Sequence, residues 1–200
     1  MAPPTTVRLS LVAPAMNAAL REARFDDAGP VELPPTGLSP LCLASRVRVV
    51  SSPSGRCRAT AEALGLSAYE VEPALAGCAM GRWRGRRLDE LATEEPESVA
   101  VWLGDPAAVP HGGESLRELR SRVAEWMEGL GTPAATQAAG APGSVTVWAV
   151  AEPDVIRAAV AHALGAPEET FWRLDVRPLQ CVELSGRTGR WNLRLGAPLP

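Results

Sequence analysis

Three short apolar runs in this chain each lead directly into a turn and then into a stretch of helical composition. Residues 7–12 (VRLSLV) lead to Pro14, residues 46–50 (RVRVV) to a Ser-Ser-Pro turn, and residues 144–150 (SVTVWAV) to Glu152. Short runs of aliphatic and β-branched residues predict buried strands. Strands that alternate with helices predict a doubly wound α/β fold, here a three-layer α/β/α sandwich around a mostly parallel sheet.

The composition is that of a single globular domain. The 200 residues are 46% hydrophobic and 22% charged, which is ordinary for such a domain. We expect one domain over residues 1–200, with residues 1–6 flexible and residues 132–143 forming a mobile connection.

Local signals predict the other elements of the chain. Helices are expected at residues 15–24, 55–64, 114–130 and 154–164, with a helical start within residues 88–97. Strands are expected at residues 67–71 and, as an edge hairpin, at residues 180–184 and 190–195. Proline and glycine indicate loops at residues 29–40, 73–88 and 104–113.

Charge and hydropathy exclude several classes of partner. The net charge is −3, so the chain has no general basic field for nucleic acid. No apolar run approaches the roughly 20 residues of a membrane-spanning helix, and the first residues have no apolar core of signal-peptide length. We therefore expect a cytoplasmic protein with no nucleic-acid or membrane partner. The sequence leaves open whether the protein forms a homodimer.

The cysteines and histidines give no sign of a metal site. The four cysteines are widely spaced, form no CxxC pair and have no neighbouring histidine: Cys42, Cys57, Cys78 and Cys181. This pattern predicts free thiols, and we expect neither a metal nor another cofactor.

Four segments, in order, resemble motifs of the histidine phosphatase superfamily, whose fold is phosphoglycerate-mutase-like. SSPSGRCRATAEALG resembles its Ser-Ser-Pro turn and phosphate-binding helix, which aligns Arg56 with the second pocket arginine. LAGCAMGRWRGRRLDEL resembles the loop that carries the general acid. PHGGESLRELRSRV resembles the entry to the long helix, and VWAVAEPDVIRAAVAHALG resembles the last core strand with its catalytic turn. The resemblance spans about residues 7 to 195 and implies the same α/β fold.

The same resemblance implies that most of the catalytic groups are missing. Where the family has Arg-His-Gly after its first strand, this chain has Ala13, Pro14 and Ala15. The second catalytic histidine aligns with Glu152, and the general acid aligns with Gly77.

Of the family's phosphotransfer groups, the resemblance retains Arg56 alone. A proline nitrogen in an amide bond has no lone pair to offer, so Pro14 cannot form a phosphoenzyme. A carboxylate at Glu152 would repel each negative charge of a phosphate dianion by about 1–4 kcal/mol at about 4 Å. We therefore predict a pseudoenzyme without phosphohistidine chemistry that binds a small molecule or a protein partner.

Two enzymatic alternatives stay open. Arg56 and Glu152 are expected to face each other in the pocket as a bidentate ion pair. In a repurposed enzyme of specialised metabolism they would be the catalytic residues, with Glu152 as general acid or base. If the pair has no catalytic role, it is a structural ion pair that only fills the vacated pocket. The second enzymatic alternative is residual phosphatase activity.

Four further residues are expected at the rim of the pocket: Met16, Cys78, Arg84 and His111. Arg84 lies in an arginine-rich loop, which would attract acidic ligands or would simply be solvated. His111 would supply an imidazole to the site or would be exposed on its loop. We interpret the cysteines as inert thiols, His162 as a residue at a helix C-terminus, and the tryptophans as packing residues.

Overall fold

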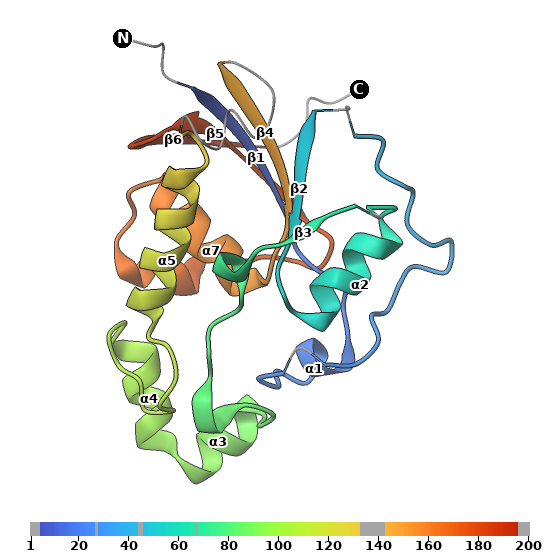
Figure 1. Ribbon diagram of the computed structural model, residues 1–200. Coiled ribbons are helices and arrows are strands. Elements are labelled where there is room, and N and C mark those ends of the chain that lie inside the picture. The colour runs from blue at the N-terminus through green and yellow to red at the C-terminus, as the bar shows by residue number, and fades with distance from the viewer. Residues whose placement is uncertain (1–4, 27, 44–45, 67, 133–142, 196–200) are drawn as a thin grey trace.

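The computed structural model describes residues 5–26, 28–43, 46–66, 68–132 and 143–195. A sheet with the strand order β3-β2-β4-β1-β5-β6 runs through its centre (Figure 1). The strands are β1 (Thr6–Val12), β2 (Val47–Ser51), β3 (Glu70–Val71), β4 (Ser144–Val150), β5 (Cys181–Arg187) and β6 (Arg190–Arg194). β1 to β4 are parallel to one another, whereas β5 pairs antiparallel with β1 and β6 antiparallel with β5. The mostly parallel α/β sheet and its edge hairpin are confirmed.

Helices connect the strands and cover the sheet. The α-helices of the described residues are α1 (Ala18–Arg21), α2 (Gly55–Ala63), α3 (Leu88–Glu94), α4 (Pro96–Gly104), α5 (Leu116–Gly129) and α7 (Pro153–Ala163). Three short 3-10 helices are η1 (Pro73–Leu75), η2 (Gly81–Trp83) and η3 (Glu168–Arg173).

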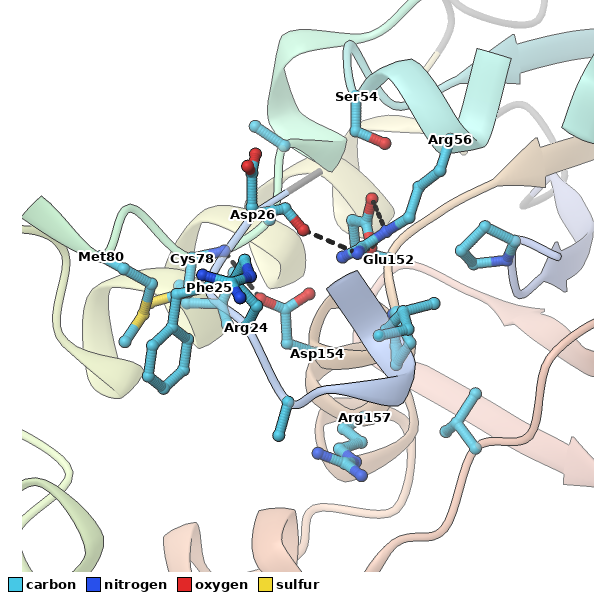
Figure 2. A pocket seen from close by; sticks show the side chains of 18 of the residues that line it. Arg24, Phe25, Asp26, Ser54, Arg56, Cys78, Met80, Glu152, Asp154 and Arg157 are labelled. Carbon is cyan, nitrogen blue, oxygen red and sulfur yellow. Dashed lines mark hydrogen bonds and ion pairs between the residues drawn. The ribbon is translucent and has the colours of Figure 1, made fainter. Parts of the chain in front are cut away.

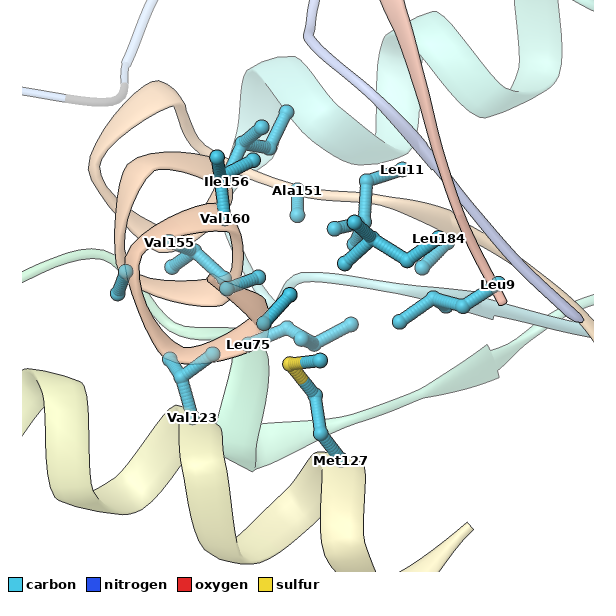
Figure 3. Close-up of a cluster of buried hydrophobic side chains, with 14 of the residues drawn as sticks. Leu9, Leu11, Leu75, Val123, Met127, Ala151, Val155, Ile156, Val160 and Leu184 are labelled. Atoms are coloured by element: carbon cyan, nitrogen blue, oxygen red, sulfur yellow. The ribbon is translucent and has the colours of Figure 1, made fainter. Parts of the chain in front are cut away.

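The helices lie on both faces of the sheet, which gives the predicted layers. α5 and α7 pack together on one face, and α2 lies on the other (Figure 1). Successive strand side chains point to opposite faces. Leu9 and Leu11 of β1 therefore enter the larger hydrophobic cluster, and Val12 enters the smaller one beside α2. Figure 3 shows the larger cluster, with Met127 of α5 and Ile156 of α7 facing the sheet.

α1 is shorter than the helix expected at residues 15–24. The N–H of Ala15 donates to Thr60 Oγ1 at 2.9 Å, which fixes this residue in the turn after β1. Asn17 then caps the helix, because its side-chain oxygen accepts from the N–H of Leu20. Ala23, with a φ of 48°, ends it.

The segment between α2 and α5 holds more helix than the sequence predicts. α4 begins at Pro96. Proline suits the first turn of a helix because an N–H at that position would have no hydrogen-bond partner within the helix. η1 and η2 interrupt the loop expected at residues 73–88. Of the strand expected at residues 67–71, residue 67 lies outside the described residues, and Glu70–Val71 form β3.

The two segments expected to be mobile fall largely outside the described residues. Residues 1–4 and 133–142 are not described, while Thr6 belongs to β1 and pairs with Ser144. Among the described residues, no helix is both long and apolar enough to cross a membrane.

Candidate active-site pocket

A pocket of about 920 Å³ opens at the carboxyl ends of β1, β2 and β4 (Figure 2). Pro14 follows β1, Ser54 follows β2 and Glu152 follows β4, and all three line it. The carboxyl ends of parallel strands are where α/β proteins bind ligands. The pocket therefore occupies the place that the turns in the sequence predict.

Two helix starts deliver the charged residues at the centre of the pocket. Ser54 caps α2 by accepting from the N–H of Cys57 at 3.2 Å, which sets Arg56 in the first turn. Pro153 occupies the first turn of α7, so Glu152 is the N-cap residue of that helix.

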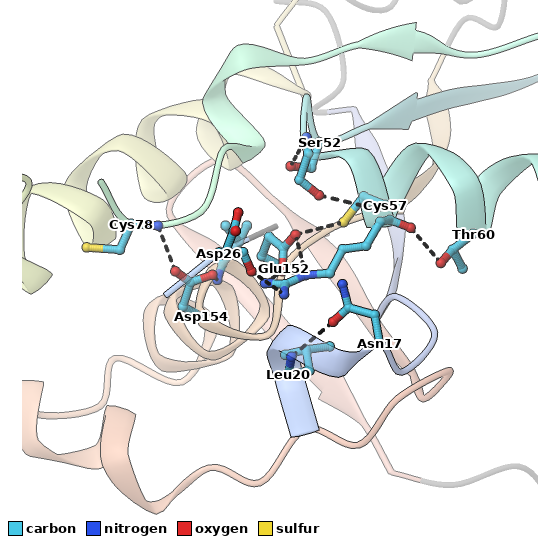
Figure 4. A network of polar contacts seen from close by, with 12 residues as sticks. Asn17, Leu20, Asp26, Ser52, Cys57, Thr60, Cys78, Glu152 and Asp154 are labelled. Carbon is cyan, nitrogen blue, oxygen red and sulfur yellow. Dashed lines mark hydrogen bonds and ion pairs between the residues drawn. The ribbon is translucent and has the colours of Figure 1, made fainter. Parts of the chain in front are cut away.

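Arg56 and Glu152 form the bidentate ion pair expected from the sequence (Figure 2). Arg56 Nε lies 2.8 Å and Nη2 lies 2.5 Å from Glu152 Oε2. The side chains are 11% and 3% exposed, so water screens this pair weakly. Arg56 Nη1 donates to the carbonyl of Asp26 at 2.8 Å. The Cys57 thiol lies 3.5 Å from Glu152 Oε1 (Figure 4).

Asp154 places a second carboxyl group in the same pocket. Its Oδ2 accepts from the backbone N–H of Cys78 at 2.7 Å, and its Oδ1 accepts from the N–H of Val155 at 2.8 Å. Burial, together with the charge of Glu152, raises the pKa of Asp154. Asp154 is therefore easier to protonate than an ordinary aspartate.

The two thiols near the pocket are not activated. Burial raises the pKa of Cys57 well above its usual value, and the Glu152 carboxylate adds to this effect. Burial, Asp154 and Glu114 raise the pKa of Cys78 in the same direction. The thiolate is the nucleophilic form, so neither cysteine is suited to nucleophilic chemistry at neutral pH.

Several residues singled out in the sequence line this pocket, and others do not. Those that line it are Pro14, Met16, Arg56, Gly77, Cys78, Arg84 and Glu152. Ala13 and Ala15 are buried and are not among the lining residues. A Cβ added at Gly77 would lie 3.3 Å from Glu152 Cγ, so this glycine leaves room for the glutamate.

His111 does not lie at the rim, which corrects the expectation from the sequence. Its side chain is 1% exposed and packs on Trp83, with ring centroids 5.2 Å apart. Its Nδ1 accepts from the N–H of Gly113. The other histidine, His162, lies in the last turn of α7, and its Nε2 contacts Glu128 Oε1 at 2.7 Å.

Local patterns in the sequence do not indicate the aromatic wall of the pocket, nor the lining residues Arg24, Asp154 and Arg157. The wall consists of Phe25, Trp102, Phe171 and Trp172, and Arg157 belongs to α7. These residues come from distant parts of the chain, and no local pattern joins them. For Arg157 there is one usable signal, since it lies three residues after Asp154 and so shares its helix face.

The comparisons with known proteins agree with this geometry. A sequence profile of the histidine phosphatase superfamily (branch 1) matches residues 42–197, which is more than half of the chain.

The chain belongs to the histidine phosphatase superfamily.

The match begins at Cys42, so it does not include β1 or the Ala-Pro-Ala turn that follows it. No protein among the curated sequences matches the chain.

Several solved structures share the fold over nearly the whole chain. A mycobacterial hydrolase is 24% identical and has a TM-score of 0.74, with 95% of this chain and 97% of that chain covered. A mycobacterial glucosyl-3-phosphoglycerate phosphatase is 23% identical, with a TM-score of 0.71 and coverages of 94% and 97%. A putative alpha-ribazole-5'-P phosphatase from Escherichia coli is 20% identical, with a TM-score of 0.70 and coverages of 94% and 95%. At these identities the likeness establishes the fold alone.

The described residues contain no group of three or more histidine, cysteine or acidic side chains arranged to hold a metal ion.

Proposed function

We propose that this member of the superfamily binds a small molecule in its pocket and does not transfer phosphoryl groups through a histidine. The observation that carries the proposal is the ion pair between Arg56 and Glu152. The arginine that would hold a phosphate is already engaged by a carboxylate through three contacts of 2.9 Å or less.

The turn after β1 supports the same proposal. Pro14 is buried there and lines the pocket at the place where the family resemblance calls for an attacking imidazole. Its nitrogen belongs to an amide bond and cannot attack phosphorus. The chain has two histidines, and both His111 and His162 are engaged away from the pocket.

Electrostatics disfavour a phosphate ligand at this point. Each negative charge of a phosphate dianion about 4 Å from the Glu152 carboxylate would meet a repulsion of about 1–4 kcal/mol, depending on the local dielectric. Asp154 adds a second acidic group to the pocket, although burial raises its pKa. The site is therefore better suited to a ligand with less negative charge than a phosphate monoester.

Titration calorimetry with inorganic phosphate tests this proposal. We expect no binding to the wild type at millimolar concentration. We expect Glu152→Gln to bind phosphate at least about tenfold more tightly, because the change releases Arg56 and removes the repulsion. Glu97→Gln makes the same charge change on the exposed surface of α4 and should behave as the wild type. Micromolar phosphate binding by the wild type would refute the proposal.

A second candidate is a repurposed enzyme, and the pairing of Glu152 with Asp154 favours it. Two carboxyl groups in one pocket, one with a raised pKa, can act as base and acid in a reaction that needs no phosphoenzyme. Under this alternative Glu152→Gln abolishes turnover of the substrate while leaving its binding measurable. Turnover unchanged in that variant would exclude it.

A further inference from the structure

We infer that the pocket binds an aromatic monocarboxylate, with the carboxylate on Arg157 and the aromatic ring against Trp102 and Trp172. This inference rests on the proposed function, because it names the ligand class of the same pocket.

The aromatic wall forms one continuous surface assembled from three separate segments. Phe25 follows α1, Trp102 belongs to α4, and Phe171 and Trp172 belong to η3. Trp102 lies edge-on to Phe25, with ring centroids 5.7 Å apart, and edge-on to Trp172 at 4.9 Å. Trp172 in turn lies 5.0 Å from Phe171. Trp102 and Trp172 are only partly buried, so each leaves ring surface that a planar ligand can contact.

Arg157 presents an unused pair of donors to the same pocket. Its Nε donates to the carbonyl of Leu174 at 2.8 Å, and its guanidinium carbon lies 5.8 Å from the centroid of the Phe171 ring. Within the part of the chain that the structure describes, its terminal nitrogens make no hydrogen bond and it has no acidic partner. The Nε contact fixes the guanidinium plane, and a fixed pair of N–H donors matches the two oxygens of a carboxylate.

The neighbouring arginines are already engaged, which singles out Arg157. Arg56 is held by Glu152, and Arg24 pairs with Glu22 at 2.8 Å and donates to the carbonyl of Gly85. Figure 2 shows Arg157 on α7, on the same helix as Asp154 and apart from the pair formed by Arg56. Asp154 directs its oxygens to the N–H groups of Cys78 and Val155 instead.

The balance of charge favours a single negative charge on the ligand. Four arginines and three acidic residues line the pocket among the described residues, so one positive charge remains when all are ionised. A monocarboxylate neutralises this single positive charge. A phosphate dianion carries one negative charge too many and is repelled by the carboxylate of Glu152. Charge complementarity of this kind sets specificity in buried sites.

Three probes with one ring system separate the contributions of ring and charge: 2-naphthoate, 2-naphthamide and 2-naphthyl phosphate. Binding is measured by titration calorimetry and by quenching of tryptophan fluorescence. We expect the carboxylate to bind the wild type about tenfold more tightly than the amide, because the amide lacks the charge that pairs with Arg157. Equal affinities for the carboxylate and the amide would overturn the inference.

Substitutions assign the two contributions to residues. Arg157→Gln should weaken the binding of 2-naphthoate by about tenfold and leave the binding of 2-naphthamide unchanged. Unchanged binding of the amide also shows that the pocket is intact. Trp102→Leu should weaken both probes by about threefold to tenfold, because both lose the same ring contact. Arg173→Gln removes an exposed arginine of η3 and should change neither. Equal weakening of both probes by Arg157→Gln, or no binding of any probe, would also overturn the inference.

The third probe separates this inference from the proposed function. If the wild type hydrolyses 2-naphthyl phosphate, the proposed function fails whatever the carboxylate does. If it leaves the ester intact and shows no preference for the carboxylate over the amide, the ligand class is wrong while the loss of phosphohistidine chemistry stands.

Discussion

At the scale of single residues, the pair of Arg56 and Glu152 determines what this pocket can do. Both side chains are nearly buried, and each satisfies the other's charge. Removing one partner of such a pair leaves an uncompensated buried charge, whereas replacing both can be nearly neutral.

We expect Glu152→Ala to lower the free energy of unfolding by about 3–5 kcal/mol, because Arg56 is left buried without its partner. The double substitution Arg56→Leu with Glu152→Leu should lower the free energy of unfolding by clearly less than Glu152→Ala does. Urea denaturation measures both, and Glu32→Ala serves as the control, since Glu32 pairs with Arg21 on the surface and its loss should have little effect. A double variant less stable than the single one would contradict this account.

His111 makes a pH dependence of stability measurable. Burial, with the nearby cation of Arg82, lowers the pKa of His111, and its Nδ1 must stay unprotonated to accept from the N–H of Gly113. The unfolded chain takes up a proton on this residue below about pH 6.5, so its stabilising contribution is present above that pH and is lost as the pH falls. We expect the wild type to lose more stability than His111→Gln between about pH 7 and about pH 5 in urea titrations. Parallel pH profiles would contradict the expectation.

The sequence predicts some of these residues and misses others for physical reasons. Arg56 and Glu152 each follow a strand directly, so their meeting at the edge of the sheet can be predicted. His111 lies in a loop, and nothing in the sequence indicates that Trp83 covers it. Arg157 joins the aromatic wall only through packing between α7 and η3, which no spacing in the sequence reveals.

At the scale of elements, the segment from residue 73 to residue 115 differs most from the expectation. Its order depends on close approaches between backbones. The N–H of Glu114 donates to the carbonyl of Ala79 at 2.7 Å, and the N–H of Arg82 donates to the carbonyl of His111 at 2.9 Å. These long-range contacts hold a loop that has no helical or strand periodicity.

The close approach of the backbone at Ala79 requires a glycine at position 113. A Cβ at this position would lie 1.8 Å from the carbonyl oxygen of Ala79, a backbone atom that cannot rotate away as the end of a side chain could. We expect Gly113→Ala to destabilise the protein by about 1–3 kcal/mol, which thermal denaturation will detect. Gly104→Ala, in α4, has nothing within 4 Å of its Cβ and is the matched control. Equal melting temperatures for the two variants would show that the loop tolerates the methyl group.

The helices show why local patterns succeed in one place and fail in another. α5 follows the prediction because Ser115 and Glu118 form a capping box and its apolar residues repeat at helical spacing. α4 is not predicted because Pro96 resembles the end of a helix, although proline is also common in the first turn of a helix.

At the scale of the whole molecule, the mostly parallel sheet and the layers can be predicted because three strands, each followed by a turn and a helix, admit few arrangements. The α/β fold is retained, and the superfamily profile covers the chain from residue 42 onward. The part outside the profile is the first strand and its turn, where the resemblance places the nucleophile. The ligand does not follow from the fold, because function is carried by the side chains of the site.

Turnover of p-nitrophenyl phosphate is the most direct test of the central claim, that this pocket cannot pass a phosphoryl group through a histidine. We expect the wild type and Arg56→Gln to release nitrophenol at the same rate as buffer alone. Saturable release by the wild type that Arg56→Gln abolishes would contradict it.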